Sequence, residues 1–183
     1  MSMAGSQPLF ENAGLPVIVM GVSGCGKTSV GERLAEALNC RFIEGDSLHP
    51  PANIERMSAG IPLTDDDRWP WLDIIGGLIG DRVARGERII VSCSALKKIY
   101  RDRLRAAAGG RLAFVFLEGS RAVFEKRMRA RAGHFMPASL LDSQFATLEP
   151  PAGEPDVVTV DVDLPLASIV EKALAGLKDF PAR

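Results

Sequence analysis

Residues 21 to 28 read Gly-Val-Ser-Gly-Cys-Gly-Lys-Thr, which matches the spacing G-x-x-x-x-G-K-[ST] of a phosphate-binding loop. Glycines in such a loop let backbone N–H groups converge on phosphate oxygens, and the lysine adds a positive charge near the β- and γ-phosphates. An apolar run over 15–20 precedes the loop, and helically spaced apolar residues follow it, which aims a helix N-terminus at the anion. The sequence predicts a nucleotide-phosphate site formed by Gly21, Val22, Ser23, Gly24, Cys25, Gly26, Lys27 and Thr28.

Composition narrows the class of protein. A chain of 183 residues fits one domain that buries about 70 % of its unfolded surface. The net charge of −1 argues against a nucleic-acid partner, which would need an excess of basic residues. Apolar runs fall far short of the roughly 20 residues of a membrane span, and no signal peptide is visible. Cys25, Cys40 and Cys93 have no metal-ligand spacing and suit a reducing compartment. We expect a cytoplasmic protein that does not associate with membranes.

The order of apolar patterns predicts the fold class. Residues 1–14 lack periodicity and are expected to form a flexible lead-in, with a single domain over 15–180. Strands are expected at 15–20, 41–46, 89–93, 112–117 and 157–161, with those at 89–93 and 112–117 buried. Helices are expected after the loop, near 53–58, from Pro70 onward, and at 96–107, 121–131, 139–148 and 166–177. This alternation predicts an α/β fold with a five-stranded parallel sheet and helices on both faces.

The loop alone does not name a reaction, because kinases, ATP-driven machines and GTP switches share it. A GTP switch would carry a base-reading Asn/Thr-Lys-x-Asp motif, which is absent. An ATP-driven machine would end its third strand in an acid, whereas Ser92-Cys93-Ser94 follows here. The compact chain resembles small-molecule kinases of the nucleoside-monophosphate and shikimate type. A shikimate-like kinase and a non-catalytic nucleotide-binding module are the alternatives.

Ordered motifs sharpen this resemblance. They include Glu44-Gly45-Asp46-Ser47-Leu48-His49-Pro50, Pro62-Leu63-Thr64-Asp65-Asp66-Asp67-Arg68, Cys93-Ser94-Ala95-Leu96-Lys97-Lys98, Gly133-His134-Phe135 and Ser143-Gln144-Phe145. Together they are similar to the gluconate kinase (gluconokinase) family across 17–178. The resemblance implies a P-loop kinase fold with a small helical lid at roughly 127–148. It further implies ATP- and Mg²⁺-dependent phosphorylation of D-gluconate to 6-phospho-D-gluconate by a homodimer.

Phosphoryl transfer requires positioned groups that orient oxygens or neutralise charge, and this assigns roles to candidate residues. Asp46, at the end of the second strand, is the candidate base for the attacking hydroxyl, although a turn or capping role suits aspartate as well. His49 is a candidate for binding substrate hydroxyls, or else a surface loop residue. Arg68 is the leading partner for the carboxylate of gluconate, because a guanidinium offers two parallel hydrogen bonds. Its alternative role is to pair in solvent with the acids at 65–67.

The remaining candidates lie later in the chain or beside the metal. Lys97 and Arg101, four residues apart on one helical face, are either substrate-binding or part of a solvated basic face. The resemblance places Arg127 and Arg131 at the lid, where they neutralise the transferring phosphate, and adds His134 to the substrate-binding residues. Thr28 and Glu44 are the metal-site candidates. Related enzymes commonly carry aspartate in place of Glu44, whose longer side chain could reach a metal-bound water.

Overall fold

The computed structural model describes residues 14–130 and 138–180, and it contains the predicted five-stranded sheet. The strands are β1 (Val17–Met20), β2 (Arg41–Glu44), β3 (Ile89–Ser92), β4 (Ala113–Glu118) and β5 (Val157–Asp161). They pair in the order β2-β3-β1-β4-β5, and every pairing is parallel. The sequence prediction of a parallel α/β sheet is confirmed.

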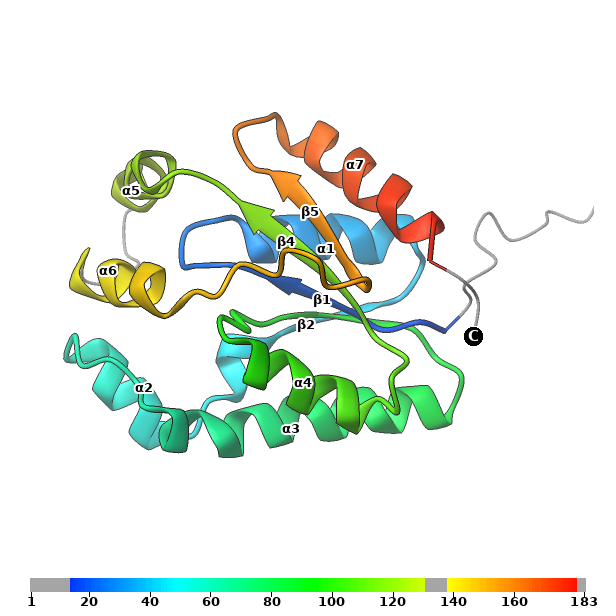
Figure 1. The fold of residues 1–183 in the computed structure, drawn as a ribbon, viewed down its shortest axis with the longest axis horizontal. Coiled ribbons are helices and arrows are strands. Elements are labelled where there is room, and N and C mark those ends of the chain that lie inside the picture. The colour runs from blue at the N-terminus through cyan, green and yellow to red at the C-terminus, as the bar shows by residue number, and fades with distance from the viewer. Residues whose placement is uncertain (1–13, 131–137, 181–183) are drawn as a thin grey trace, which may run out of the picture.

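Helices cover both faces of this sheet (Figure 1). The helical elements are α1 (Lys27–Ala37), a 3₁₀ turn η1 (Gly45–Leu48), α2 (Pro51–Ser58), α3 (Asp65–Ala84), α4 (Lys98–Ala107), α5 (Arg121–Ala130), α6 (Ala138–Thr147) and α7 (Leu166–Lys178). Helices α1 and α7 pack on one face, and α3 and α4 pack together on the other. Strands β1 and β3 are buried throughout, as expected for central strands covered on both sides.

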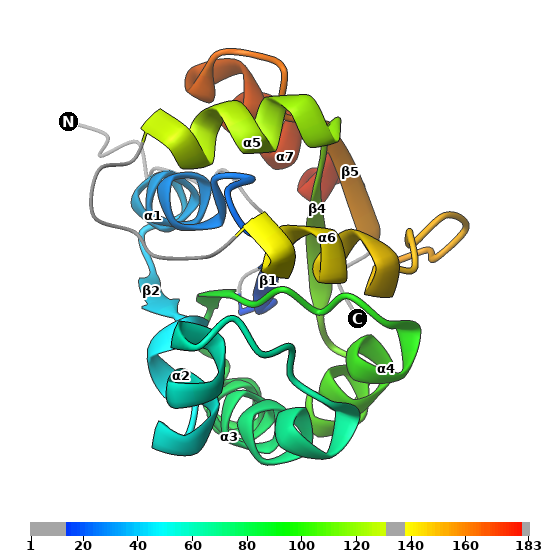
Figure 2. The ribbon, with the colours of Figure 1, turned by 90° about the vertical axis from the view of Figure 1, so that its left-hand side faces the viewer.

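The carboxyl ends of the strands meet at the end of the molecule where α2, α5 and α6 gather (Figure 2). In open parallel sheets this edge is where ligands bind. The loop after β1 leads directly into α1, and η1 follows β2 at the same edge. The topology therefore brings the predicted phosphate loop and the predicted acids to one place.

Helix α3 begins earlier than the sequence analysis expects. Pro70 was expected at the first helical position, but the helix starts at Asp65. Thr64 caps it by accepting a hydrogen bond from the Asp67 backbone, and the Asp67 side chain accepts in turn from the Thr64 backbone. This capping box satisfies two amides that a helix start leaves unpaired. Pro70 lies in the second turn, where it removes one backbone hydrogen bond.

Several predictions concern residues beyond the described ranges. Most of the lead-in at 1–14, together with Arg131 and His134, lies outside them. The single domain over 15–180 and the lid over 127–148 stay predictions. Among residues 14–130 and 138–180, no helix is both long enough and apolar enough to cross a membrane.

Candidate active site

The loop over 21–28 adopts the conformation that its glycines allow. Gly21, Gly24 and Gly26 all have positive φ, a region that side chains with a Cβ seldom enter. Gly26 also caps the N-terminus of α1 in a left-handed conformation. The loop therefore wraps around the start of the helix, where free amides and the helix dipole favour an anion.

Lys27 is folded back onto this loop. Its Nζ donates to the carbonyl oxygens of Gly21 and Val22, each at 3.1 Å. Burial disfavours the charged ammonium, but the thiol of Cys25 and the carboxylates of Asp46 and Glu44 outweigh it, so the pKa of Lys27 is raised. The lysine therefore stays positive beside the loop across the physiological range of pH.

Glu44 ends β2 and joins the loop to the neighbouring strand. One carboxylate oxygen accepts from the hydroxyl of Thr28, and the other accepts from the hydroxyl of Ser92 at the end of β3. Parallel pairing of β2 with β3 sets Glu44 opposite Ser92 and so explains the second contact. The extra methylene of glutamate thus does not prevent the carboxylate from reaching Thr28.

Gly45 separates the two acids and packs closely against β3. Its N–H donates to Ser92 Oγ at 3.0 Å, and its carbonyl oxygen accepts from Trp71 Nε1 at 2.8 Å. A Cβ at this position would lie 1.9 Å from the carbonyl oxygen of Ser92. Only glycine fits there, and the chain then turns so that Asp46 faces a cavity instead of the Thr28 hydroxyl.

A cavity of about 280 Å³ lies between the loop, η1, α2 and α6. It is lined by Ser23, Lys27, Asp46, His49, Ile54, Met57, Ser58, Pro62, Leu63, Arg68, Ser94, Leu140, Ser143 and Gln144. The structure thus brings together the predicted loop lysine, the candidate base and two predicted substrate residues. One end carries Lys27 of the phosphate loop, so the cavity lies beside the predicted phosphate site.

His49 is fixed in this cavity in its neutral form. Its ring stacks on Trp71, and Nδ1 lies 3.3 Å from Asn53 Nδ2. Burial, followed by the positive charge of Arg68, lowers the pKa of His49 to about 4. Because an amide nitrogen can only donate, Nδ1 is the acceptor, which leaves the proton on Nε2 as a donor.

Arg68 contributes a buried cation to the same cavity. Only 7 % of the residue is exposed, its guanidinium lies 5.5 Å from the centre of the Tyr100 ring, and Nε has no hydrogen-bond partner among the described residues. A buried, unpartnered donor is costly unless a ligand satisfies it. This environment differs from the solvated pairing with Asp65–Asp67 that was the alternative.

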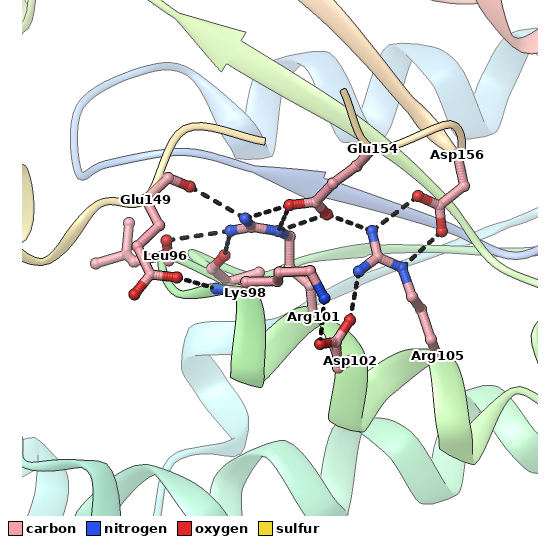
Figure 3. A network of polar contacts seen from close by, with 9 residues as sticks. Leu96, Lys98, Arg101, Asp102, Arg105, Glu149, Glu154 and Asp156 are labelled. Atoms are coloured by element: carbon pink, nitrogen blue, oxygen red, sulfur yellow. Dashed lines mark hydrogen bonds and ion pairs between the residues drawn. The ribbon is translucent and has the colours of Figure 1, made fainter. Parts of the chain in front are cut away.

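Lys97 and Arg101, predicted to bind substrate or to form a solvated basic face, do not line this cavity. Lys97 Nζ pairs with Asp65 at 2.9 Å and does not line the cavity. Arg101 is fully buried and bonds Glu154 through Nε and Nη2, as Figure 3 shows. Its remaining donors go to the carbonyl oxygens of Ala95, Leu96 and Glu149. Every N–H of Arg101 is thus used within the protein, and its burial differs from the solvated face that was the alternative.

Arg127 lies on the other side of the phosphate loop. It donates to the carbonyl oxygens of Cys25, at 3.2 Å, and Val162, at 2.6 Å. A second cavity of about 310 Å³ opens there, lined by Cys25, Gly26, Ser29, Val30, Arg127, Ala130, Leu164, Leu166 and Ile169. The loop is thus flanked by two cavities, one on its Asp46 side and one on its Arg127 side.

Sequence reasoning missed several residues of the site. Asn53 and Trp71 fix His49, Ser92 holds Glu44, and Gln144 accepts from the loop amide of Ser23 at 2.7 Å. A hydroxyl at the end of the strand next to an acid was the one usable signal for Ser92. The described residues contain no group of three His, Cys, Asp or Glu side chains able to hold a metal.

Comparisons with known proteins identify the family. A model of the AAA domain family matches residues 17–151. The thermosensitive gluconokinase of Escherichia coli (strain K12) is 45 % identical over 87 % of this chain and 86 % of its own, and the gluconokinase of Gluconobacter oxydans is 49 % identical over 79 % and 80 %. A crystal structure of a gluconokinase from Sinorhizobium meliloti 1021 superposes with a TM-score of 0.84 and 60 % identity, covering 91 % of this chain and 93 % of that one. The chain, with its phosphate loop between two cavities, belongs to the gluconokinase family of P-loop kinases.

Proposed function

We propose that this protein transfers the γ-phosphoryl group of ATP to the 6-hydroxyl of D-gluconate. The observation that carries the proposal is one cavity shared by Lys27 of the phosphate loop, the carboxylate of Asp46 and the buried guanidinium of Arg68. An acid beside the phosphate loop can accept a hydroxyl proton, and a buried cation with an unpartnered nitrogen suits an anionic acceptor.

In this proposal the acceptor spans the cavity from Arg68 to Asp46. Arg68 binds the carboxylate of gluconate, and the Nε2–H of neutral His49 donates to a hydroxyl. The 6-hydroxyl then lies against Asp46, next to Lys27. Asp46 takes the hydroxyl proton as the new O–P bond forms, the bond from the γ-phosphorus to the bridging oxygen breaks, and ADP leaves with that electron pair.

ATP occupies the other side of the loop. Its phosphates bind the loop amides, and Lys27 moves from the Gly21 and Val22 carbonyls onto them. The nucleoside extends into the cavity beside Arg127, which neutralises phosphate charge from its present position near Cys25. Arg131 and His134 complete the proposed set as further phosphate and substrate ligands.

Thr28 and Glu44 are the proposed residues of the magnesium site. Their oxygen atoms suit a hard cation, and a site with one carboxylate and one hydroxyl fits Mg²⁺, which keeps several waters and binds substrate phosphates. When bound, Mg²⁺ neutralises charge on the β- and γ-phosphate oxygens. Ser92 holds the Glu44 carboxylate toward this position.

We also propose a homodimer and a cytoplasmic location. The family resemblance supports the homodimer, and a gel-filtration mass tests it. The three free cysteines are consistent with a reducing compartment.

A coupled assay of ADP release tests the reaction against its alternatives. The purified chain is given MgATP with gluconate, shikimate or a nucleoside monophosphate in turn. We expect rapid ADP release with gluconate alone. Release with shikimate would favour the other kinase class, and ATP binding without release for any acceptor would favour a binding module.

A further inference from the structure

The peptide group between Val22 and Ser23 is held at both ends by side chains. Its carbonyl oxygen accepts from Lys27 Nζ at 3.1 Å and from the backbone N–H of Cys25 at 3.3 Å, and its N–H donates to Gln144 Oε1 at 2.7 Å. A trans peptide is planar, with its C=O and N–H pointing in opposite directions. These contacts therefore fix how this peptide is rotated relative to the cavity.

Helix α6 delivers Gln144 to the loop from a separately anchored position. Leu141 is buried, and Phe145 stacks on Phe124 with ring centroids 5.8 Å apart. After the helix, the Glu149 N–H donates to the Leu96 carbonyl oxygen at 2.8 Å, and its carboxylate accepts from the Lys98 N–H at 2.7 Å (Figure 3). The place of the Gln144 carboxamide is thus set by packing that does not depend on Ser23.

The orientation of this peptide matters for phosphoryl transfer. Ser23 and Gln144 line the cavity together with Lys27 and Asp46, so this peptide borders the space that the proposed reaction assigns to the transferring phosphoryl group. A donor whose peptide is already rotated toward the developing negative charge does not have to rotate during the reaction and only exchanges its acceptor. The opposite rotation would present the Val22 carbonyl oxygen and repel that charge.

Lys27 cannot keep this peptide in place during turnover. In the proposed reaction its ammonium leaves the Val22 carbonyl for the phosphates, and the carbonyl oxygen then keeps only the longer hydrogen bond from the Cys25 N–H, at 3.3 Å. Gln144 then remains as the side chain that holds the peptide on its N–H side until the phosphoryl oxygen arrives.

We propose that Gln144 is a positioning residue for phosphoryl transfer, which keeps the Ser23 N–H directed at the cavity and yields it to the transferring phosphoryl group. The inference rests on the proposed kinase reaction. It assigns the glutamine no contact with a reacting atom before transfer, and its effect is exerted through the backbone of the loop.

Gln144→Met tests this role, because methionine matches glutamine in length and helix propensity but lacks an oxygen acceptor. We expect kcat to fall about 10- to 100-fold, the scale of a misplaced reacting group or a lost donor. The dissociation constant for ATP and the KM for gluconate should change less than about threefold, because the loss arises in the transition state. Ser139→Ala, an exposed position on the same helix, is the matched control and should leave all three unchanged.

A second measurement tests the orientation of the Val22–Ser23 peptide directly. In the ligand-free protein, Gln144→Met should shift the Ser23 amide resonance and speed its hydrogen exchange, and Ser139→Ala should not. Wild-type kcat in Gln144→Met would overturn the proposal, as would a loss of kcat that follows a lower Tm and disappears on cooling. Failure of the wild-type chain to phosphorylate gluconate would instead refute the proposed reaction, while the Ser23 amide still reports whether Gln144 orients the loop.

Discussion

The imidazole of His49 lies on the indole of Trp71, with ring centroids 3.9 Å apart and planes inclined by 16°. The indole in turn donates from Nε1 to the carbonyl oxygen of Gly45, between the two acids. A single buried tryptophan thus holds both the histidine of the cavity and the backbone at the end of β2. Burial of His49 in this stack makes its protonation unfavourable.

Stability should therefore depend on pH through His49. Its pKa is about 4 in the folded protein, below the ordinary value of 6.5, so the unfolded chain binds the proton more tightly. The stabilising contribution is complete above pH 6.5 and is lost as pH falls toward 4, with an upper limit of about 3 kcal/mol. Chemical denaturation at pH 7 and pH 4.5 should give a larger loss of unfolding free energy for wild type than for His49→Gln. Equal losses would contradict the prediction.

Asp46→Asn should impair the chemical step while leaving binding largely intact. Asparagine keeps the size and one carbonyl acceptor but cannot take a proton, so kcat should fall on the order of 10²- to 10⁴-fold. Steady-state kinetics together with dissociation constants for ATP and gluconate separate the two effects. Asp66→Asn, at an exposed position in α3, is the control. Near-normal turnover of Asp46→Asn would contradict the role of Asp46 as a base and leave it the role of a turn or capping residue.

Arg68→Lys should raise the KM for gluconate more than the KM for ATP. Lysine keeps the charge but loses the two-pronged donor that lies 5.5 Å from the centre of the Tyr100 ring. A tenfold change in KM is a reasonable scale for one lost charge-assisted hydrogen bond. Initial-rate kinetics with each substrate varied in turn measures it, with Arg33→Lys at an exposed site as control. A change confined to ATP would assign Arg68 to the nucleotide.

Glu44→Gln should increase the Mg²⁺ concentration needed for half-maximal rate. The amide can still meet one of the hydroxyls of Thr28 and Ser92, but it removes the negative charge beside the proposed cation. Mutation of residues that support metal ligands commonly lowers metal affinity by about 10- to 100-fold. Initial rates measured over a series of Mg²⁺ concentrations at fixed ATP test this prediction, with Glu32→Gln at an exposed position as the control. An unchanged Mg²⁺ requirement would remove Glu44 from the metal site.

Arg101→Met should reduce stability far more than it changes substrate affinity. It leaves Glu154 with one of its two arginine partners and removes the bonds that tie the segment after α6 to α4. Loss of one member of a buried ion pair costs about 3–5 kcal/mol, whereas an exposed pair contributes about 1 kcal/mol or less. The control is Lys98→Met, which breaks the exposed pair with Asp102. In urea denaturation, Arg101→Met should lose more unfolding free energy than Lys98→Met. A raised KM for gluconate in a stable Arg101→Met would restore the original prediction.

Local patterns predicted much of this molecule. Strands such as β3 are continuous apolar runs, and the loop before α1 has fixed spacing, so neither depends on distant residues. Parallel pairing also places Lys27 and Asp46 at one sheet edge, which the order of elements implies. The start of α3 was misjudged because the proline signal at Pro70 was weighted above the capping residues Thr64 and Asp67.

Long-range contacts account for what the sequence did not reveal. The role of Arg101 was predicted from its spacing to Lys97 on one helical face, whereas its partner Glu154 lies 53 residues away in the sequence. The contact between Ser23 and Gln144 joins residues 121 positions apart. A charge or an amide carries no sequence signal for the partner that will bury it, so these roles emerge only when the chain is folded.

The close approach of Gly45 to β3 limits how this site can be altered to accept other acceptors. Because no Cβ fits there, the spacing between Glu44 and Asp46 and the direction in which each leaves the strand cannot be adjusted by substitution at the intervening position. The opposite wall of the cavity has no such restriction, since Ile54 and Leu63 contribute side chains that remain partly or largely exposed. Changes in acceptor preference, in evolution or in the laboratory, should therefore accumulate at positions such as Ile54 and Leu63 while the acidic edge of the sheet stays constant.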